Sequence, residues 1–311
     1  MKIGGIELKN QLCLAPLAGV TTLPVREFFT SLGASLTHTE MISCAGLIRD
    51  NKKTFDMLET SENEAPLVVQ LFAPDEKILI PGAEKALNIC KKFSAFGINI
   101  ACPMPKITKN GSGAALLKKP ETAFKMVSEL KKLNLPVWVK IRKLENEKDT
   151  LKFIEILLKA GADNVCIHGR TQAQRYEGVA DRKIVKTAAE KFQNYISASG
   201  DVKEISDIKE YLSMGCVAVM LARGAIANPF MFEEFFNDNS VLKTQNEKLE
   251  ILINFSNRAR ELSGEHKALV LLKRFSGSML KFAKGSAEMR RRACMSTSLD
   301  ELVKILHEQG E

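Results

Sequence analysis

Short apolar runs alternate with longer amphipathic segments over residues 1–230. The apolar runs predict strands at residues 13–17, 35–39, 67–71, 97–100, 137–141, 164–167, 195–198 and 218–221. Between most of them, apolar residues recur every three or four positions, as over 114–133 and 150–160, which predicts helices. The run at 137–141 is apolar at nearly every position, as in a parallel strand covered on both faces. Eight alternations of strand and helix predict an α/β fold, a (β/α)8 TIM barrel.

This architecture has one structural rival, an open doubly wound sheet. In that fold a glycine-rich phosphate-binding turn follows the first strand. No such turn follows residues 13–17, so the sequence favours the barrel.

The pattern changes after Pro229. A polar stretch at 237–240 predicts a linker, and from residue 243 to residue 307 the apolar positions follow a helical period. The periodic residues are Leu249, Leu252, Phe255, Leu269, Leu272, Phe275, Met279, Phe282, Leu299, Leu302, Ile305 and Leu306. We therefore predict a barrel domain over residues 1–236, followed by a small all-helical domain of three or four helices over residues 243–311.

The composition excludes several classes of protein. Of the 311 residues, 45% are hydrophobic and 26% are charged, which is unlike a disordered or low-complexity chain. The longest apolar run, 215–222, is too short to span a membrane, and Glu7 and Lys9 stand where an export signal needs apolar residues. Seven cysteines without a CxxC pair indicate a reduced cytoplasmic protein that has no disulfides and no metal site. We also expect a monomer.

The positive charge is concentrated in one segment. The whole chain carries +8, and residues 266–292 contain eight Lys or Arg and one acid, a net charge of +7. A focused basic surface indicates a polyanionic partner such as a nucleic acid. The alternative is an ordinary solvated helix face.

Polar or glycine-rich elements follow every predicted strand, at the end of a barrel where the chemistry lies. After the last two strands, Gly200 and Gly224 would let backbone amides approach a ligand, and with Arg223 they predict a phosphate site. Lys140, on the fifth strand, would face an electron-rich ring and stabilise negative charge on it. The alternative for Lys140 is a structural ion pair with Glu40.

Two further residues at strand ends each have an ordinary alternative. His168, on the sixth strand, would donate a hydrogen bond to the same ring or phosphate, or it is a histidine satisfied within the core. Gln70, on the third strand, offers both a donor and an acceptor, as the polar edge of a flavin requires. Neither residue identifies a cofactor by itself.

Cys102 follows the fourth strand and opens a loop, CPMPKITKNGSG (102–113), long enough to fold over a site. A thiol with the ordinary pKa of about 8.5 is mostly protonated at neutral pH and is a usable general acid. Lys106 and Lys109 of this loop are within reach of phosphates. The cysteines assigned to packing are Cys13, Cys90, Cys166 and Cys216, whereas the role of Cys44, just beyond the second strand, is left open.

These motifs resemble those of the tRNA-dihydrouridine synthases. The matching segments, in family order, are APLAGVTTLPVR (15–26), TEMIS (39–43), VQLF (69–72), INIACPMPKITKNGSGAALLKKP (98–120), VKIR (139–142), IHGRT (167–171), SGDV (199–202) and ARGAIANP (222–229). The Cys-Pro loop is the most specific of them, and the tail with AEMRRRACMSTS (287–298) resembles the RNA-binding domain of the family. The resemblance implies an FMN oxidoreductase that reduces the C5–C6 double bond of particular tRNA uridines, with NADPH as reductant.

The resemblance also implies roles for individual residues. Cys102 would be the catalytic acid that protonates uracil C5, while a hydride from flavin N5 reaches C6. The cofactor would be bound by Pro16, Leu17, Ala18, Gln70, Lys140, His168, Ser199, Gly200, Asp201, Ala222 and Arg223. We expect Asn99 and Arg170 to seat the uracil, and the tRNA to be bound by Lys106, Lys109, Lys273, Arg274, Arg290, Arg291 and Arg292.

The chain departs from the family pattern at three places. Beside Cys102 the usual Met-Gly is replaced by Ile100-Ala101, a change that bears on the geometry of the loop. SGD (199–201) stands for the usual NGD, and Ser199 keeps a hydroxyl there. A basic motif of the family is replaced over residues 275–278, just after Lys273 and Arg274, so the mode of tRNA docking and the target uridine stay open.

Two rival functions remain to be weighed. An FMN barrel that acts on a free pyrimidine, such as a dihydroorotate dehydrogenase-like enzyme, would share the phosphate and lysine features but would not need a basic tail. A non-catalytic RNA-binding protein on a decayed barrel would not keep Gln70, Cys102, Lys140, His168 and Arg223 together. The motifs do not separate NADPH from NADH.

Overall fold

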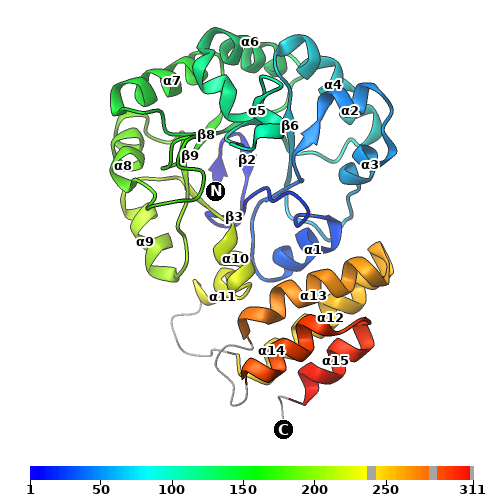
Figure 1. The fold of residues 1–311 in the computed structure, drawn as a ribbon. Helices are drawn as coiled ribbons and strands as arrows, with labels where there is room; N and C mark the ends of the chain where they lie inside the picture. The colour runs from blue at the N-terminus through cyan, green and yellow to red at the C-terminus, as the bar shows by residue number, and fades with distance from the viewer. Residues whose placement is uncertain (237–242, 280–285, 309–311) are drawn as a thin grey trace.

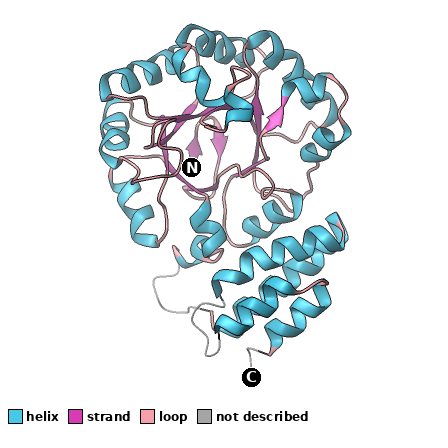
Figure 2. Cartoon of the chain, in the orientation of Figure 1, coloured by secondary structure: helices cyan, strands magenta, loops and turns pink. Residues whose placement is uncertain are grey.

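Eight parallel strands form a barrel in the computed structural model, which describes residues 1–236, 243–279 and 286–308 (Figure 1, Figure 2). The strands of the ring are β3 (Leu12–Leu14), β4 (Thr37–His38), β6 (Leu67–Phe72), β7 (Ala95–Ile100), β8 (Val137–Arg142), β9 (Asn164–His168), β10 (Ile196–Ser199) and β11 (Ala218–Leu221). The ring closes between β3 and the segment before β4, where the Leu14 amide donates to the Leu36 carbonyl oxygen at 2.8 Å. The predicted (β/α)8 barrel is confirmed.

Helices connect the strands and surround the barrel (Figure 1). They are α1 (Leu23–Ser31), α2 (Cys44–Ile48), α3 (Lys52–Phe55), α4 (Glu76–Ile89), α5 (Pro105–Thr108), α6 (Pro120–Lys131), α7 (Glu147–Lys159), α8 (Arg182–Lys191) and α9 (Ile205–Ser213), with 3-10 turns η1 (Asp56–Leu58) and η2 (Gly113–Lys118). A short strand outside the ring, β5 (Ile42–Ser43), pairs with β6. In α7 the Asn146 side chain accepts the Asp149 amide at the start, and Gly161 (φ +100°) stands just beyond the end. Local sequence thus sets both ends of this helix.

The single helix predicted over residues 114–133 is wrong. The chain forms the 3-10 turn η2 first and then α6, which begins at Pro120. A proline disfavours the helical conformation of the residue before it, and Lys119 accordingly has a ψ of 65°. Pro120 itself occupies the first helical position, where a missing N–H is tolerated.

The first two barrel strands are shorter than predicted. β3 ends at Leu14 rather than at residue 17, and β4 covers two residues only. The Ala15 amide still donates to the Leu221 carbonyl oxygen at 2.9 Å, but Pro16 has no N–H to continue the ladder. The chain therefore leaves the sheet at Pro16 and turns into the mouth of the barrel.

A short hairpin that the sequence did not predict covers the amino-terminal end of the barrel. It consists of β1 (Lys2–Ile3) and β2 (Ile6–Glu7), joined by two glycines of positive φ. The Trp138 Nε1 donates to the Gly4 carbonyl oxygen at 2.9 Å, and a Cβ on Gly4 would lie 2.6 Å from that nitrogen. The hairpin isoleucines and the indole are buried, so the base of the barrel is closed.

Four helices make up the described part of the tail, in line with the predicted all-helical segment. The barrel ends with α10 (Arg223–Ala227) and α11 (Met231–Glu234), and the tail contains α12 (Gln245–Ser263), α13 (Glu265–Met279), α14 (Ser286–Met295) and α15 (Leu299–His307). Apolar residues predicted from the period, such as Leu252, Phe275 and Leu302, are buried. The predicted linker at 237–240, the basic residues Lys281 and Lys284, the side chain of Met279 and the whole of Phe282 lie outside the described residues.

Phenylalanine rings join the tail to the barrel. The ring of Phe28 in α1 stacks on that of Phe255 in α12, with centroids 4.4 Å apart. Phe275 in α13 packs edge-on against Phe29, at 5.8 Å between centroids. Ion pairs border this cluster, Arg258 with Glu27 at 3.0 Å and Lys248 with Glu234 at 2.7 Å. Figure 1 shows α12 and α13 beside α1 accordingly.

Two negative findings apply to residues 1–236, 243–279 and 286–308. No helix there is long and apolar enough to cross a membrane. No three His, Cys, Asp or Glu side chains of these residues gather where they would hold a metal ion.

Candidate active site

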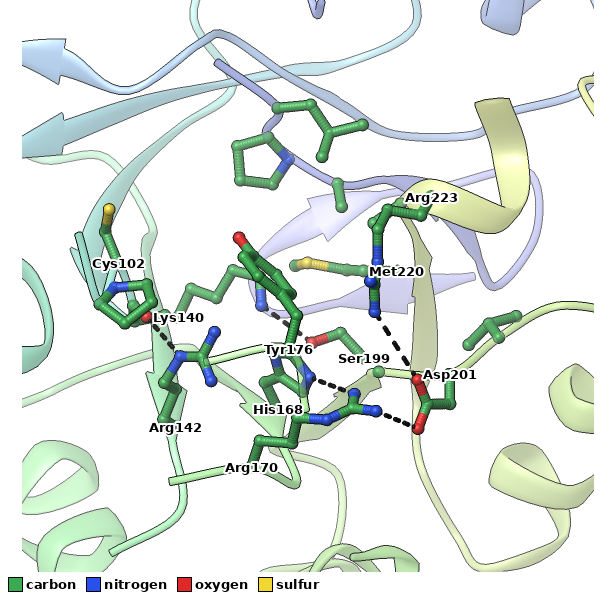
Figure 3. Close-up of a pocket in the computed structure, with 18 of the residues that line it drawn as sticks. Cys102, Lys140, Arg142, His168, Arg170, Tyr176, Ser199, Asp201, Met220 and Arg223 are labelled. Atoms are coloured by element: carbon green, nitrogen blue, oxygen red, sulfur yellow. Dashed lines mark hydrogen bonds and ion pairs between the residues drawn. The ribbon is translucent and has the colours of Figure 1, made fainter. Parts of the chain in front are cut away.

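A cavity of about 680 Å³ opens at the carboxyl ends of the barrel strands (Figure 3). Ligand pockets in proteins commonly measure about 300–1,000 Å³. The residues predicted from the sequence that line it are Pro16, Leu17, Ala18, Asn99, Cys102, Lys140, His168, Arg170, Ser199, Gly200, Asp201, Ala222 and Arg223. The fold thus brings residues from β7, β8, β9, β10 and β11, and from the segments that follow β3, β7, β9, β10 and β11, to one cavity.

The backbone around Cys102 is held from two sides. The Asn99 Oδ1 accepts hydrogen bonds from the amides of Ala101 at 3.1 Å and Cys102 at 2.9 Å. The Arg142 Nε donates to the Ala101 carbonyl oxygen at 2.7 Å. At the far end of the loop, Gly113 (φ +59°) lies so close that a Cβ would be 2.7 Å from the Cys102 carbonyl oxygen. The thiol is therefore carried on a fixed piece of backbone.

Burial raises the pKa of the Cys102 thiol above its ordinary value. The amide of Met104 and the charge of Arg142 act in the opposite direction and do not cancel the effect of burial. The thiol is partly accessible, so it is protonated at neutral pH and in contact with the cavity. That combination suits a proton donor.

The other six cysteines do not line the cavity. All seven are free thiols, and Cys13, Cys44, Cys166 and Cys216 are buried. The open question about Cys44 is answered by its position, since its side chain is packed against Gly82 of α4. Cys294 is exposed on α14, at a distance in the fold from the barrel strands.

Lys140 reaches from β8 into the cavity and donates to the Ser199 hydroxyl at 2.8 Å (Figure 3). Burial lowers the pKa of its ammonium group. The ion pair with Glu40, which was the alternative for Lys140, is not formed. The Glu40 carboxylate instead accepts a hydrogen bond from the Gly19 amide.

Gln70 does not line the cavity. It is buried behind Asn99, and its Oε1 accepts a hydrogen bond from the Asn99 Nδ2 at 2.8 Å. The same nitrogen lies 3.0 Å from the Met41 Sδ. Gln70 thereby fixes which way the Asn99 amide faces, with its oxygen toward the Cys102 backbone.

His168, Arg170, Asp201 and Arg223 form a polar cluster on one wall (Figure 3). The Arg170 guanidinium contacts the His168 Nε2 at 3.2 Å and the Asp201 carboxylate at 2.7 Å, and Arg223 lies 3.8 Å from the same carboxylate. Burial, reinforced by the surrounding cations, lowers the pKa of His168 to about 2, so the imidazole is neutral. Arg170 also donates to the carbonyl oxygens of Glu177 and Gly178. Its predicted role toward uracil stays a prediction.

Several large side chains of the cavity, among them Arg142 and Tyr176, were not among the predicted site residues. Arg142 lies 5.5 Å from the ring centre of Tyr176, and Arg223 lies 4.8 Å from it, so the ring stands between two guanidinium groups (Figure 3). Arg142 follows Lys140 by two positions on β8, and side chains two positions apart on a strand point to the same face. The sequence could therefore have placed Arg142 on the inner face beside Lys140. Tyr176 comes from the long segment between β9 and α8, which has no periodic signal.

The glycines of the predicted phosphate site have a structural reason of their own. A Cβ on Gly224 would lie 2.0 Å from the Val202 carbonyl oxygen. A Cβ on Gly200 (φ +111°) would lie 2.6 Å from the His168 Cδ2. Close packing of the chain against itself therefore requires both glycines, in addition to any approach by a ligand.

The cations predicted to bind tRNA lie outside the cavity. Lys106 and Lys109 are exposed on and just after α5. The Lys273 ammonium donates to the carbonyl oxygens of Cys294 and Ser296 at 2.8 and 2.6 Å, where it ties α13 to the end of α14.

The arginines of the tail have partners within the protein. The Arg274 Nη1 donates to the Gly19 carbonyl oxygen at 3.0 Å. Arg291 pairs with Glu288 at 2.7 Å and Arg292 with Glu308 at 2.6 Å, whereas Arg290 is partly buried on the same helix. The local charge of this surface is lower than the count of arginines suggests.

The charge of the cavity favours an anionic ligand. Its lining includes five cationic side chains, Lys140, Arg142, Arg170, Lys203 and Arg223, and one carboxylate, Asp201. Since His168 is neutral, the excess is positive. Ala15, Pro16 and Met220 add an apolar surface on which a flat ring fits.

The chain is similar to known proteins in sequence and in fold. A sequence profile of the family described as Dihydrouridine synthase (Dus) matches residues 13–309. A "Probable tRNA-dihydrouridine synthase" of Aquifex aeolicus is 30% identical over 311 residues and 97% of each chain. A "tRNA-dihydrouridine synthase B" of Pasteurella multocida is 28% identical over 86% of this chain and 82% of its own. The solved structure described as "Crystal structure of TcOYE with pHBA" has a TM-score of 0.60 at 11% identity, over 80% of this chain and 94% of that one.

Proposed function

The chain belongs to the dihydrouridine synthase family, and on that premise we propose that it reduces the C5–C6 double bond of uridines in tRNA, with FMN as cofactor and NADPH as reductant. The observation that carries the proposal is the cavity at the carboxyl end of the barrel, which combines a protonated thiol, a lysine ammonium group and a cationic wall.

The residues of the cavity fit FMN. The positive excess suits a phosphate, and the apolar surface suits a planar ring. We assign the ring to Pro16, Leu17, Ala18, Lys140 and His168, with Gln70 behind them, and the ribityl and phosphate groups to Ser199, Gly200, Asp201, Ala222 and Arg223. Bound there, FMN would pass the electrons of NADPH to uracil as a hydride at C6.

Lys140 and Arg223 would stabilise negative charge in this site. Lys140 is fixed by the Ser199 hydroxyl, so its charge is oriented before any ligand arrives. The cost of reorganising solvent around a developing anion is thereby reduced. His168 stays neutral and can donate only one ring N–H.

Cys102 would hold the proton that uracil needs at C5. Hydride addition at C6 leaves negative charge that is delocalised to C5 and the C4 oxygen, and protonation at C5 completes the reduction. The raised pKa keeps the proton on Sγ until that charge develops. Asn99 and Arg142 fix the backbone that carries the thiol, and Asn99 and Arg170 would seat the base.

The uracil must leave its stack to enter the cavity, which costs a few kcal/mol and is easiest in a tRNA loop. We assign catalysis to the domain 1–236 and attraction of the RNA backbone to the domain 243–311, together with Lys106 and Lys109. Favourable contacts to phosphate would offset the cost of unstacking. We place the reaction in the cytoplasm and expect a monomer to perform it.

The experiment that tests the proposal starts from purified protein. We expect a yellow protein that releases FMN on denaturation and oxidises NADPH. Sequencing of tRNA from cells that lack the protein should show the loss of dihydrouridine at defined positions. A colourless protein that fails to bind added FMN would show that the protein is not an FMN oxidoreductase. Reduction of free pyrimidines but not of tRNA would favour the rival function, an enzyme that acts on a free pyrimidine.

A further inference from the structure

A hydrogen bond links the helical tail to the mouth of the barrel. The Arg274 Nη1, on α13, donates to the Gly19 carbonyl oxygen at 3.0 Å. The amide of the same Gly19 donates to the Glu40 carboxylate, which comes from the segment between β4 and β5. Gly19 is therefore held from two sides by charged groups of two other elements.

Gly19 is the apex of the 15–22 loop, whose other side lines the cavity through Pro16, Leu17 and Ala18. The base of the loop is fixed, because Thr21 exchanges hydrogen bonds with the backbone of Leu17 at 3.2 Å. The apex is different. Gly19 is exposed, has a φ of +68°, and nothing lies within 4 Å of the place where its Cβ would be.

The turn is closed by its own backbone, since the amides of Val20 and Thr21 donate to the Leu17 carbonyl oxygen at 3.0 Å, and Val20 is buried. Gly19 itself has no packed neighbour at its Cβ position, so the orientation of its two peptide groups depends on their hydrogen bonds. The bonds that reach Gly19 from outside this loop come from Arg274 and Glu40.

Arg274 is itself well anchored. The next residue, Phe275, is fully buried among the rings of Phe28, Phe29 and Phe255. This cluster fixes the α13 backbone against α1, which follows the 15–22 loop directly in the chain. The guanidinium thus has a rigid support on the barrel itself.

We propose that Arg274 is a positioning residue for the cofactor site. It holds the apex of the 15–22 loop and thereby keeps the Leu17 and Ala18 wall against the bound cofactor. The inference rests on the proposed function, since it takes FMN as the ligand of the cavity. The tail would then help to shape the cavity even when no RNA is bound.

The test is the affinity for FMN in the absence of tRNA. Apoprotein is titrated with FMN, and the quenching of flavin fluorescence gives the dissociation constant of the parent and of full-length variants. We expect Arg274→Gln to weaken FMN binding about fivefold, the effect of losing roughly one net hydrogen bond. Glu40→Gln, which alters the hydrogen bond to the amide of the same residue, should weaken FMN binding as well.

Two further variants separate positioning from a general effect. Lys267→Gln removes a positive charge from the same helix, two turns before Arg274. No bond of Lys267 to the 15–22 loop is found within the described residues. The dissociation constant of this variant for FMN should therefore stay within twofold of the parent. Arg274→Lys keeps a cationic donor and should restore most of the affinity. The visible spectrum of bound flavin should shift in Arg274→Gln and not in Lys267→Gln.

The outcomes are distinguishable. Equal FMN dissociation constants for Arg274→Gln and Lys267→Gln would overturn the positioning role, even when Arg274→Gln weakens tRNA binding. A parent protein that binds no FMN would instead overturn the proposed function. Thermal unfolding of each variant shows that the compared proteins are folded.

Discussion

The side-chain oxygen of Asn99 accepts a hydrogen bond from the Cys102 backbone amide at 2.9 Å. The two residues lie three positions apart where β7 ends, so the asparagine caps the turn that carries the thiol. Gln70 fixes the asparagine in turn, through its Oε1. The backbone that carries the thiol is thus held by side chains of neighbouring barrel strands, and the far end of the loop adds a hydrogen bond from the Ala114 amide to the Cys102 carbonyl oxygen at 3.0 Å.

Substitution of the thiol tests its role as acid. We expect Cys102→Ala to keep the flavin and to oxidise NADPH at the parent rate, because neither step uses the thiol. Uridine reduction should fall by about 10²–10⁴, the usual contribution of a general acid. The measurement is a single-turnover reduction of tRNA by prereduced enzyme. Cys294→Ala, at the exposed thiol of α14, is the matched control and should react like the parent. An unchanged single-turnover rate for Cys102→Ala would show that Cys102 is not the proton donor.

The pH dependence of the same step follows from the raised pKa of Cys102. The acid form is the active form, so the rate constant should be flat through neutral pH. It should decline only above the raised pKa, and therefore at higher pH than for an unperturbed thiol, whose pKa is about 8.5. Single-turnover rates from pH 6 to pH 10 measure this. A rate constant that rises with pH over this range would indicate that the thiolate is the active form.

The salt dependence of tRNA binding distinguishes the cations of the surface. Arg291 and Arg292 are paired with acids, whereas no acidic partner of Lys106 or Lys109 is found in the described part of the chain. Each phosphate contact contributes about 0.9 to the slope of log K against log salt in duplex DNA, and we expect a similar order for tRNA. Lys106→Gln with Lys109→Gln should therefore reduce the slope more than Arg291→Gln with Arg292→Gln. Equal reductions would show that tRNA breaks the ion pairs.

Two buried histidines make the fold sensitive to acid. Burial lowers the pKa of His38 to about 4, and its Nδ1 lies 2.8 Å from the Leu14 carbonyl oxygen. Between that value and about 6.5 the unfolded chain binds the proton and the folded chain does not, so the free energy of unfolding falls as the pH falls, by about 1.4 kcal/mol per pH unit. His168 acts in the same direction.

His38→Asn tests this relation, since the amide nitrogen can still donate to the Leu14 carbonyl. We expect the variant to lose less stability than the parent between pH 7 and pH 5, by about 2 kcal/mol. Urea unfolding at the two pH values measures the difference. The same pH dependence in both proteins would mean that folding does not lower the pKa of His38.

The phenylalanine cluster predicts that barrel and tail unfold together. Phe275→Ala removes a fully buried ring, which typically costs about 3–5 kcal/mol. Trp138, the one tryptophan of the chain, lies at the base of the barrel and reports on that part alone. Its fluorescence transition should shift with the circular dichroism transition. Phe124→Ala, at an exposed ring of α6, is the control, and a Trp138 transition that stays in place in Phe275→Ala would show that the domains unfold independently.

The sequence predicted the barrel and most of the cavity, because both depend on local patterns. Apolar runs at regular intervals define the strands, and the residue types at strand ends meet at one mouth by the geometry of the fold. Lys140 and Cys102 were found in this way. Pro120 shows the limit of periodicity, since one proline divides a segment whose apolar spacing reads as a single helix.

The residues that were missed depend on contacts distant in sequence. Tyr176 enters the cavity because Arg142 and Arg223 flank its ring, and no local pattern reports such a contact. The side chain of Gln70 could hydrogen-bond a ligand, but it lies behind Asn99 and does not reach the cavity. The position of Gln70 along β6 relative to Asn99 on β7 decides this, and the sequence alone does not give it. The contact of Arg274 with Gly19 joins positions 255 residues apart.

The hairpin that covers the base of the barrel has a kinetic consequence. Trp138 and the hairpin close that end, so in the proposed reaction the nicotinamide and the uracil would have to enter and leave by the same mouth. Two planar rings would not fit on one face of the proposed cofactor together, and each would have to depart before the other arrives. Initial velocities measured at several concentrations of both substrates should therefore give parallel double-reciprocal lines, the pattern of alternating half-reactions.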